Sequence, residues 1–143
     1  MKLKKKENAN EENVARGKRA KRKGGNYERL IAKILGDKYK VELKRTPQSG
    51  GFAKKSEKAD DFRGDITIVD NKQVLLLHCE CKDKKTWKLK DWLRQAESDC
   101  PEGRVPLVIF HEHGSSRNYV CLSLDDFTDL VPRNKVVGKR VFK

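Results

Sequence analysis

The stretch that decides the fold is residues 75–82, Leu-Leu-Leu-His-Cys-Glu-Cys-Lys, an apolar run that ends in an acid and a lysine two positions apart. Its composition predicts a buried β-strand. Because side chains alternate across a strand, His78, Glu80 and Lys82 share one face. The other face holds Leu77, Cys79 and Cys81. Charge is costly to bury, so we expect one face to pack in the core and the other to carry chemistry.

Length and charge limit the classes of function. The chain has 143 residues, which favours one domain, and 34 Lys and Arg against 21 Asp and Glu give a net charge of +13. This charge favours a polyanionic partner, with nucleic acid as the first candidate and an anionic membrane surface as the second. The membrane alternative is weaker because no long apolar stretch, lipidation motif or signal peptide is present. We expect an intracellular protein, cytoplasmic or nucleoid-associated, without a membrane partner.

The first 25 residues differ from the rest of the chain. They hold ten Lys or Arg and three Glu, have almost nothing to bury, and end in Gly24-Gly25. This composition predicts a disordered basic arm over 1–25, and residues 26–143 are expected to form the folded domain. The folded part is basic on its own, with 24 Lys or Arg against 18 Asp or Glu. A solubilising tail is the alternative role for the arm.

Periodicity along residues 26–143 predicts an α/β fold. Asn26 is a candidate cap for a helix whose apolar residues recur at i, i+3, i+4, i+7 and i+8 and which ends at Gly36. The remaining segments are expected as a strand over 39–43, a hairpin of strands over 65–69 and 73–82, a helix over 89–100, strands over 105–110 and 119–122, and a helix over 125–130. Together they predict a single domain with a central mixed β-sheet flanked by helices. The four cysteines are expected to be reduced and buried.

Two acids and a lysine have a spacing that suits cleavage of a phosphodiester. In a short hairpin, Asp65 lies opposite a residue between Leu76 and His78. Glu80 is then its diagonal or next-but-one neighbour. Carboxylates that face one point repel each other unless a hard cation lies between them, and Mg²⁺ or Mn²⁺ suits oxygen ligands of this kind. Lys82 can orient an attacking water and offset charge on the phosphate. In a chain that is 38% charged, an ordinary surface salt bridge is the alternative.

A long loop, residues 44–64, supplies candidate DNA contacts. Its first part combines a guanidinium, hydroxyl groups and glycines, which can bring hydrogen-bond donors against phosphates. The candidate DNA-binding residues in this loop and after Lys82 are Arg45, Gln48, Ser49, Gly50, Lys54, Lys55, Arg63, Lys84 and Lys85. The loop lacks P-loop spacing, so nucleotide binding is not supported.

These features, in this order, resemble the PD-(D/E)XK nuclease superfamily, and within it the archaeal-type Holliday junction resolvases and their phage relatives. The resemblance extends from about Gly25 to Leu130 and implies a restriction-endonuclease-like core. Arg45, Ser49 and Gly50 match a loop that contacts DNA in that family. The residues that the resemblance makes catalytic are Glu28, Asp65, Glu80, Lys82 and Gln95. The long loop and the basic arm depart from the shared pattern.

The resemblance implies a Mg²⁺-dependent endodeoxyribonuclease, with Mn²⁺ as a substitute metal. Asp65, Glu80 and the backbone carbonyl of Cys81 would hold the metal, and Lys82 would position the attacking water. Glu28 would complete or tune the metal shell. The implied substrate is branched DNA, in particular the four-way junction, and the implied assembly is a homodimer. A phage-encoded protein is one origin that fits this subgroup.

Two other functions remain open. The superfamily also contains nucleases for other DNA, so a flap, a mismatch or a duplex is an alternative substrate. A non-catalytic nucleic-acid-binding protein is the alternative from another class, in which the carboxylates only pair with neighbouring lysines. This binding protein would show a steep salt dependence and no metal-dependent cleavage product.

Overall fold

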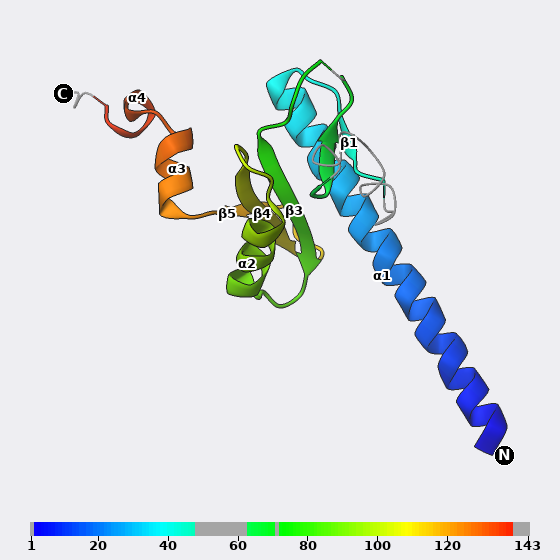
Figure 1. Ribbon diagram of the computed structural model, residues 1–143. Coiled ribbons are helices and arrows are strands. Elements are labelled where there is room, and N and C mark those ends of the chain that lie inside the picture. The colour runs from blue at the N-terminus through cyan, green and yellow to red at the C-terminus, as the bar shows by residue number, and fades with distance from the viewer. Residues whose placement is uncertain (1, 48–62, 71, 139–143) are drawn as a thin grey trace.

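The computed structural model describes residues 2–47, 63–70 and 72–138 and confirms the predicted α/β class (Figure 1). Its elements, in chain order, are α1 (Lys2–Tyr39), β1 (Leu43–Arg45), β2 (Ile66–Ile68), β3 (Leu77–Lys84), α2 (Leu89–Asp99), β4 (Val105–Glu112), β5 (Tyr119–Cys121), α3 (Leu124–Leu130) and α4 (Arg133–Val136). The strands form two small sheets, an antiparallel pair of β1 with β2 and a mixed sheet in the order β3-β4-β5.

The mixed sheet forms the centre of the domain. β3 runs parallel to β4, with Glu80 opposite Val108, and β5 is antiparallel to β4. The face toward α1 packs in a cluster that includes Tyr27, Ile31, Cys79, Cys81, Leu107 and Ile109. The face toward α2 packs in a cluster of Trp92, Ala96, Val108 and Phe110. The two helices therefore cover opposite faces of the sheet (Figure 1). All four thiols are free and the two cysteines of β3 lie in the core as predicted, whereas Cys100 and Cys121 are only half-buried, because they lie at the end of α2 and on the edge strand β5.

The first helix is longer at both ends than predicted. α1 has 38 residues, so the predicted start at Asn26 and the predicted end at Gly36 are wrong. The basic arm is the outer part of this helix, and its residues 9–22 are exposed and project away from the sheets (Figure 1). Ala, Glu, Lys and Arg favour helix, and extending a helix that is already packed requires no new nucleus. Among the described residues, no helix is long and apolar enough to cross a membrane.

The strand pairing around β2 also differs from the prediction. Among the described residues, β2 forms no ladder with β3 and pairs instead with β1, with Thr67 opposite Lys44. The predicted hairpin is wrong because β3 begins only at Leu77, which leaves a connection too long for a tight turn. The predicted strand over 39–43 is shifted to Leu43–Arg45, since α1 continues to Tyr39.

The remaining elements match the prediction closely. α2, β4, β5 and α3 each lie within two residues of the expected bounds at either end. α4 was not predicted, and it is a single turn with no buried residue.

Gly64 allows the chain to approach β3. Its φ of +78° lies in the left-handed region, and a Cβ at this position would lie 3.1 Å from both the Cys79 carbonyl oxygen and the His78 Nδ1. The next residue, Asp65, donates its backbone N–H to the same Cys79 oxygen at 2.8 Å. Any side chain at position 64 would therefore push Asp65 away from β3.

We expect Gly64→Ala to destabilise the protein more than Gly103→Ala. Both glycines have φ of +78°, but an added Cβ at Gly103 has no atom within 4 Å. The control therefore reports only the backbone strain, about 1 kcal/mol, and Gly64→Ala should lose at least about 1 kcal/mol more through the clash. Urea unfolding of both variants measures the difference. Equal losses of stability in the two variants would show that a Cβ at position 64 causes no clash.

Candidate active site

A pocket of about 390 Å³ lies at the outer edge of β3, the edge strand of its sheet. α1 and α2 both contribute to its wall. All five residues predicted to be catalytic line it: Glu28, Asp65, Glu80, Lys82 and Gln95. These residues come from α1, the start of β2, β3 and α2, so the fold assembles a cluster from four separate parts of the chain.

Asp65 is fixed to β3 by its backbone and its side chain. Its N–H donates to the Cys79 carbonyl, and its Oδ2 accepts a hydrogen bond from the Cys81 N–H at 2.7 Å. Because backbone groups two residues apart point to the same edge of a strand, the Cys81 carbonyl lies on this edge too. Burial and the nearby Glu80 charge raise the pKa of Asp65 to about 7, although the Cys81 hydrogen bond opposes the shift. Two carboxylates, those of Asp65 and Glu80, therefore lie close together at this edge.

Glu80 and Lys82 form an ion pair inside the pocket. Glu80 is 8% exposed, and its Oε2 lies 3.0 Å from the Lys82 Nζ. The same Nζ donates a hydrogen bond to the Gln95 Oε1 at 3.3 Å. Gln95 therefore holds the ammonium of Lys82 from the side of α2, and Lys82 lies between the amide and the carboxylate.

Glu28 is held by an arginine from β1. Arg45 Nε donates to the Glu28 Oε2, and both side chains are largely buried. The guanidinium passes closely over Gly25, where an added Cβ would lie 3.1 Å from the Arg45 Cζ. Arg45, predicted to bind DNA, is therefore placed next to the pocket, where it neutralises an acid.

The other predicted DNA-binding residues fall into three groups. Lys84 and Lys85 are exposed and line the pocket. Arg63 is exposed two residues before Asp65. The predicted contacts that lie outside the described residues are Gln48, Ser49, Gly50, Lys54 and Lys55.

The donor set of the pocket fits a hard divalent cation. Asp65 and Glu80 bring two carboxylates to one pocket, and their mutual repulsion contributes to the raised pKa of Asp65. The Cys81 carbonyl adds a neutral oxygen on the same edge. Mg²⁺ commonly takes one or two carboxylates and fills its shell with water and phosphate oxygens. Within the described ranges, no group of three or more His, Cys, Asp or Glu side chains is arranged as a complete metal cage, so water and substrate would supply the remaining ligands.

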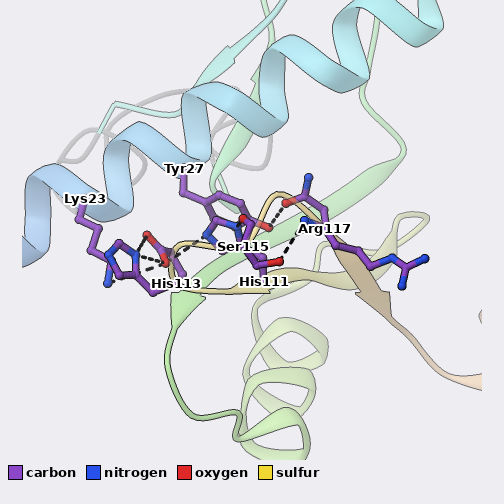
Figure 2. A network of polar contacts seen from close by, with 8 residues as sticks. Lys23, Tyr27, His111, His113, Ser115 and Arg117 are labelled. Carbon is purple, nitrogen blue, oxygen red and sulfur yellow. Dashed lines mark hydrogen bonds and ion pairs between the residues drawn. The ribbon is translucent and has the colours of Figure 1, made fainter.

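Sequence reasoning missed a polar network beside this pocket (Figure 2). Asp83 has a side chain only 7% exposed, with His111 Nε2 at 3.1 Å, His113 Nδ1 at 2.9 Å and Lys23 Nζ at 3.8 Å from its Oδ1. Tyr27 stacks on His111 with 4.0 Å between ring centroids. The pairing of Asp83 with His111 follows from the β3–β4 register. The sequence does not reveal this register, so the network could not be predicted from it.

We expect Asp65→Asn to stabilise the metal-free protein increasingly as pH rises. The folded-state pKa is raised to about 7 from 3.8, so the unfolded chain releases this proton first and wild-type stability falls between about pH 4 and pH 7. The amide cannot ionise but can still accept the Cys81 N–H. Urea unfolding in EDTA should show the gain in free energy of unfolding growing by on the order of 2 kcal/mol across this window. Asp129→Asn, at an exposed position on α3, is the control, and a gain that is constant with pH would refute the expectation.

Comparison with known protein families gives a match over residues 19–142 to the family described as "Phage putative PDDEXK endonuclease". No curated protein and no solved structure was found to match. The matched range contains Glu28, Asp65, Glu80, Lys82 and Gln95, the residues that line the pocket at β3. The family match supports the nuclease class that the sequence predicted. Since the match spans most of the 143 residues, the chain belongs to this family of phage PDDEXK endonucleases.

Proposed function

We propose that the protein is a metal-dependent endodeoxyribonuclease that hydrolyses phosphodiester bonds at the β3 pocket. The observation that carries this proposal is the convergence of Asp65 and Glu80 at an open strand edge, where burial and the Glu80 charge raise the pKa of Asp65 to about 7. Repulsion between two carboxylates is tolerated where both acids bind a common ligand. The family match supports the same reaction class.

Metal binding and the positioning of water would fall to different residues of the pocket. Asp65, Glu80 and the Cys81 carbonyl would hold Mg²⁺, or Mn²⁺ in its place. When bound, the metal would polarise the phosphate and lower the pKa of a water molecule. Lys82, held between Glu80 and Gln95, would orient the attacking water and place positive charge beside the phosphate as charge develops on it.

Glu28 and Arg45 would act at the border of the site. In the structure the charges of Glu28 and Arg45 compensate each other. A phosphate near Arg45 would compete with Glu28 for the guanidinium, because the planar donor fork of arginine fits a phosphate as well as it fits a carboxylate. Substrate binding would then make the Glu28 carboxylate available to the metal shell.

For the substrate we propose branched DNA, with the four-way junction as the first choice. The support is the resemblance to junction resolvases in the order of Glu28, Asp65, Glu80 and Lys82, together with the net charge of +13. The same resemblance supports a homodimer that cuts opposed strands. A phage-encoded enzyme that acts inside the host cell agrees with the family match. Other DNA structures, such as flaps, mismatches and duplex, remain the alternative substrates.

One observation favours the non-catalytic alternative. Glu80 pairs with Lys82 at 3.0 Å, and Glu28 pairs with Arg45, as expected if the acids served only to form salt bridges in a DNA-binding protein. Asp65 argues against this alternative, because no Lys or Arg among the described residues forms an ion pair with it. Its charge instead meets a backbone N–H.

Cleavage of a labelled four-way junction and of a matching linear duplex tests these proposals. Wild type should give symmetric cuts in the junction with Mg²⁺ and none with EDTA. Asp65→Asn and Glu80→Gln should bind the junction as tightly in EDTA and cleave at least about 100-fold more slowly, since each removes a charge that holds the metal. Asp129→Asn serves as the control with wild-type activity.

The outcomes separate the candidates. Metal-dependent cuts in both substrates would replace the resolvase by a broader nuclease. Tight binding without a product at any Mg²⁺ or Mn²⁺ concentration would support the binding protein. Wild-type cleavage by Asp65→Asn would refute the site itself.

A further inference from the structure

A second pocket, of about 630 Å³, lies beside the active-site pocket. It is formed by the arm side of α1 together with the turn between β4 and β5. Lys23 and Asp83 line both pockets, so the two hollows meet at this pair of residues. The polar residues that matter for the argument are Arg19, Arg22, His111, His113, Ser115 and Ser116.

The charge of the second pocket is positive. Asp83 is its acidic residue, and this carboxylate is buried against His111, His113 and Lys23. Arg19 and Arg22 are exposed, and among the described residues neither forms an ion pair or a hydrogen bond. Two guanidiniums without a counter-charge would bind an anion that enters the pocket.

Contacts between α1 and the β4–β5 region form the floor of the pocket. Tyr27 stacks on His111, as Figure 2 shows, and the Tyr27 hydroxyl donates to the Asn118 Oδ1 at 3.0 Å, so α1 is held against β4 and the segment before β5. His111 Nδ1 lies 3.0 Å from the Ser115 carbonyl oxygen, which connects the β4–β5 turn to the same cluster. The serine hydroxyls of this turn are hydrogen-bond donors for phosphate oxygens.

Helical spacing aligns the two pockets along α1. Ala20, Gly24 and Glu28 recur every four residues and face the active site, whereas Arg19, Arg22 and Lys23 face the second pocket or its border. Two of the residues that line the active-site pocket before Glu28, Ala20 and Gly24, are small, and an added Cβ at Gly24 would have no neighbour within 4 Å. The two pockets therefore lie on adjoining sides of α1 and meet at Lys23 and Asp83.

We propose that the second pocket binds the phosphate backbone of DNA next to the bond that is cleaved, with Arg19 and Arg22 as the anchoring residues. The inference rests on the proposed function in one respect, that DNA is the substrate. It gives the last turns of the basic arm a defined role in holding the substrate strand. The family match, which begins at residue 19, includes both arginines.

DNA affinity in EDTA tests the proposal without reference to cleavage. Fluorescence anisotropy with a labelled duplex and a four-way junction, each at several salt concentrations, should show weaker binding by Arg19→Gln/Arg22→Gln. Two lost phosphate contacts predict a salt slope smaller by about 1.8 and an affinity lower by roughly 30-fold at 0.15 M salt. Arg19→Lys/Arg22→Lys should retain most of the affinity, because it keeps the charge.

Lys18→Gln/Lys21→Gln is the matched control. It removes two charges at the same spacing from the same helix, and neither lysine lines either pocket. It should change the affinity by less than about threefold. Equal losses in both double variants would show that net charge alone governs binding, and unchanged affinity in Arg19→Gln/Arg22→Gln would show that no phosphate binds here. Either result would overturn the proposal.

Cleavage assays on the same variants separate this proposal from the nuclease proposal. Wild type that binds DNA through Arg19 and Arg22 but cleaves nothing would refute the nuclease and leave the phosphate pocket supported. Wild type that cleaves DNA and binds it independently of these arginines would support the nuclease and refute the pocket.

Discussion

The attachment of Asp65 to the edge of β3 is the constraint on which the site depends. The backbone of Asp65 joins the two sheets, since its N–H donates to the Cys79 carbonyl and its carbonyl accepts from the Thr46 N–H at 2.9 Å. Its carboxylate is then fixed by the Cys81 N–H. A residue in regular pairing could not direct both its backbone and its side chain at one neighbouring strand. The irregular start of β2, with Gly64 in the left-handed region, is what makes this arrangement possible.

Of the acids Glu28, Asp65 and Glu80, two have a cationic partner and one does not. Glu28 pairs with Arg45 and Glu80 pairs with Lys82, whereas Asp65 forms no ion pair among the described residues and accepts the Cys81 N–H. Burial and the neighbouring Glu80 charge raise the pKa of Asp65 to about 7. Asp65 is therefore the position where a divalent cation would gain most. The acids of the pocket are thus unequally compensated, and Asp65 is the least compensated of the three.

The sequence predicted the members of the site better than the way they meet. Alternation along β3 correctly assigned Cys79 to the core and Glu80 to the pocket, because both patterns are local. The hairpin that was to bring Asp65 to Glu80 is absent, yet the two residues meet, since a non-local pairing of β1 with β2 carries Asp65 there. The contact of Asp83 with His111 was not predicted for the same reason, because only the register between distant strands places His111 beside Asp83. Tertiary pairing cannot be derived from periodicity alone.

The glycine pair Gly24-Gly25, which the sequence suggested as the boundary of the arm, has a different role in the structure. Two glycines inside a helix cost roughly 1 kcal/mol each relative to alanine, which is why the pair resembles a boundary between arm and domain. In the structure α1 runs through both, and the cost is offset by what their missing side chains permit. Gly25 gives Arg45 access to Glu28, and Gly24 keeps the pocket open beside Glu28 and Glu80. The glycine pair therefore marks where the basic helix passes the pocket at β3, so the arm and the acids of the pocket are parts of one surface.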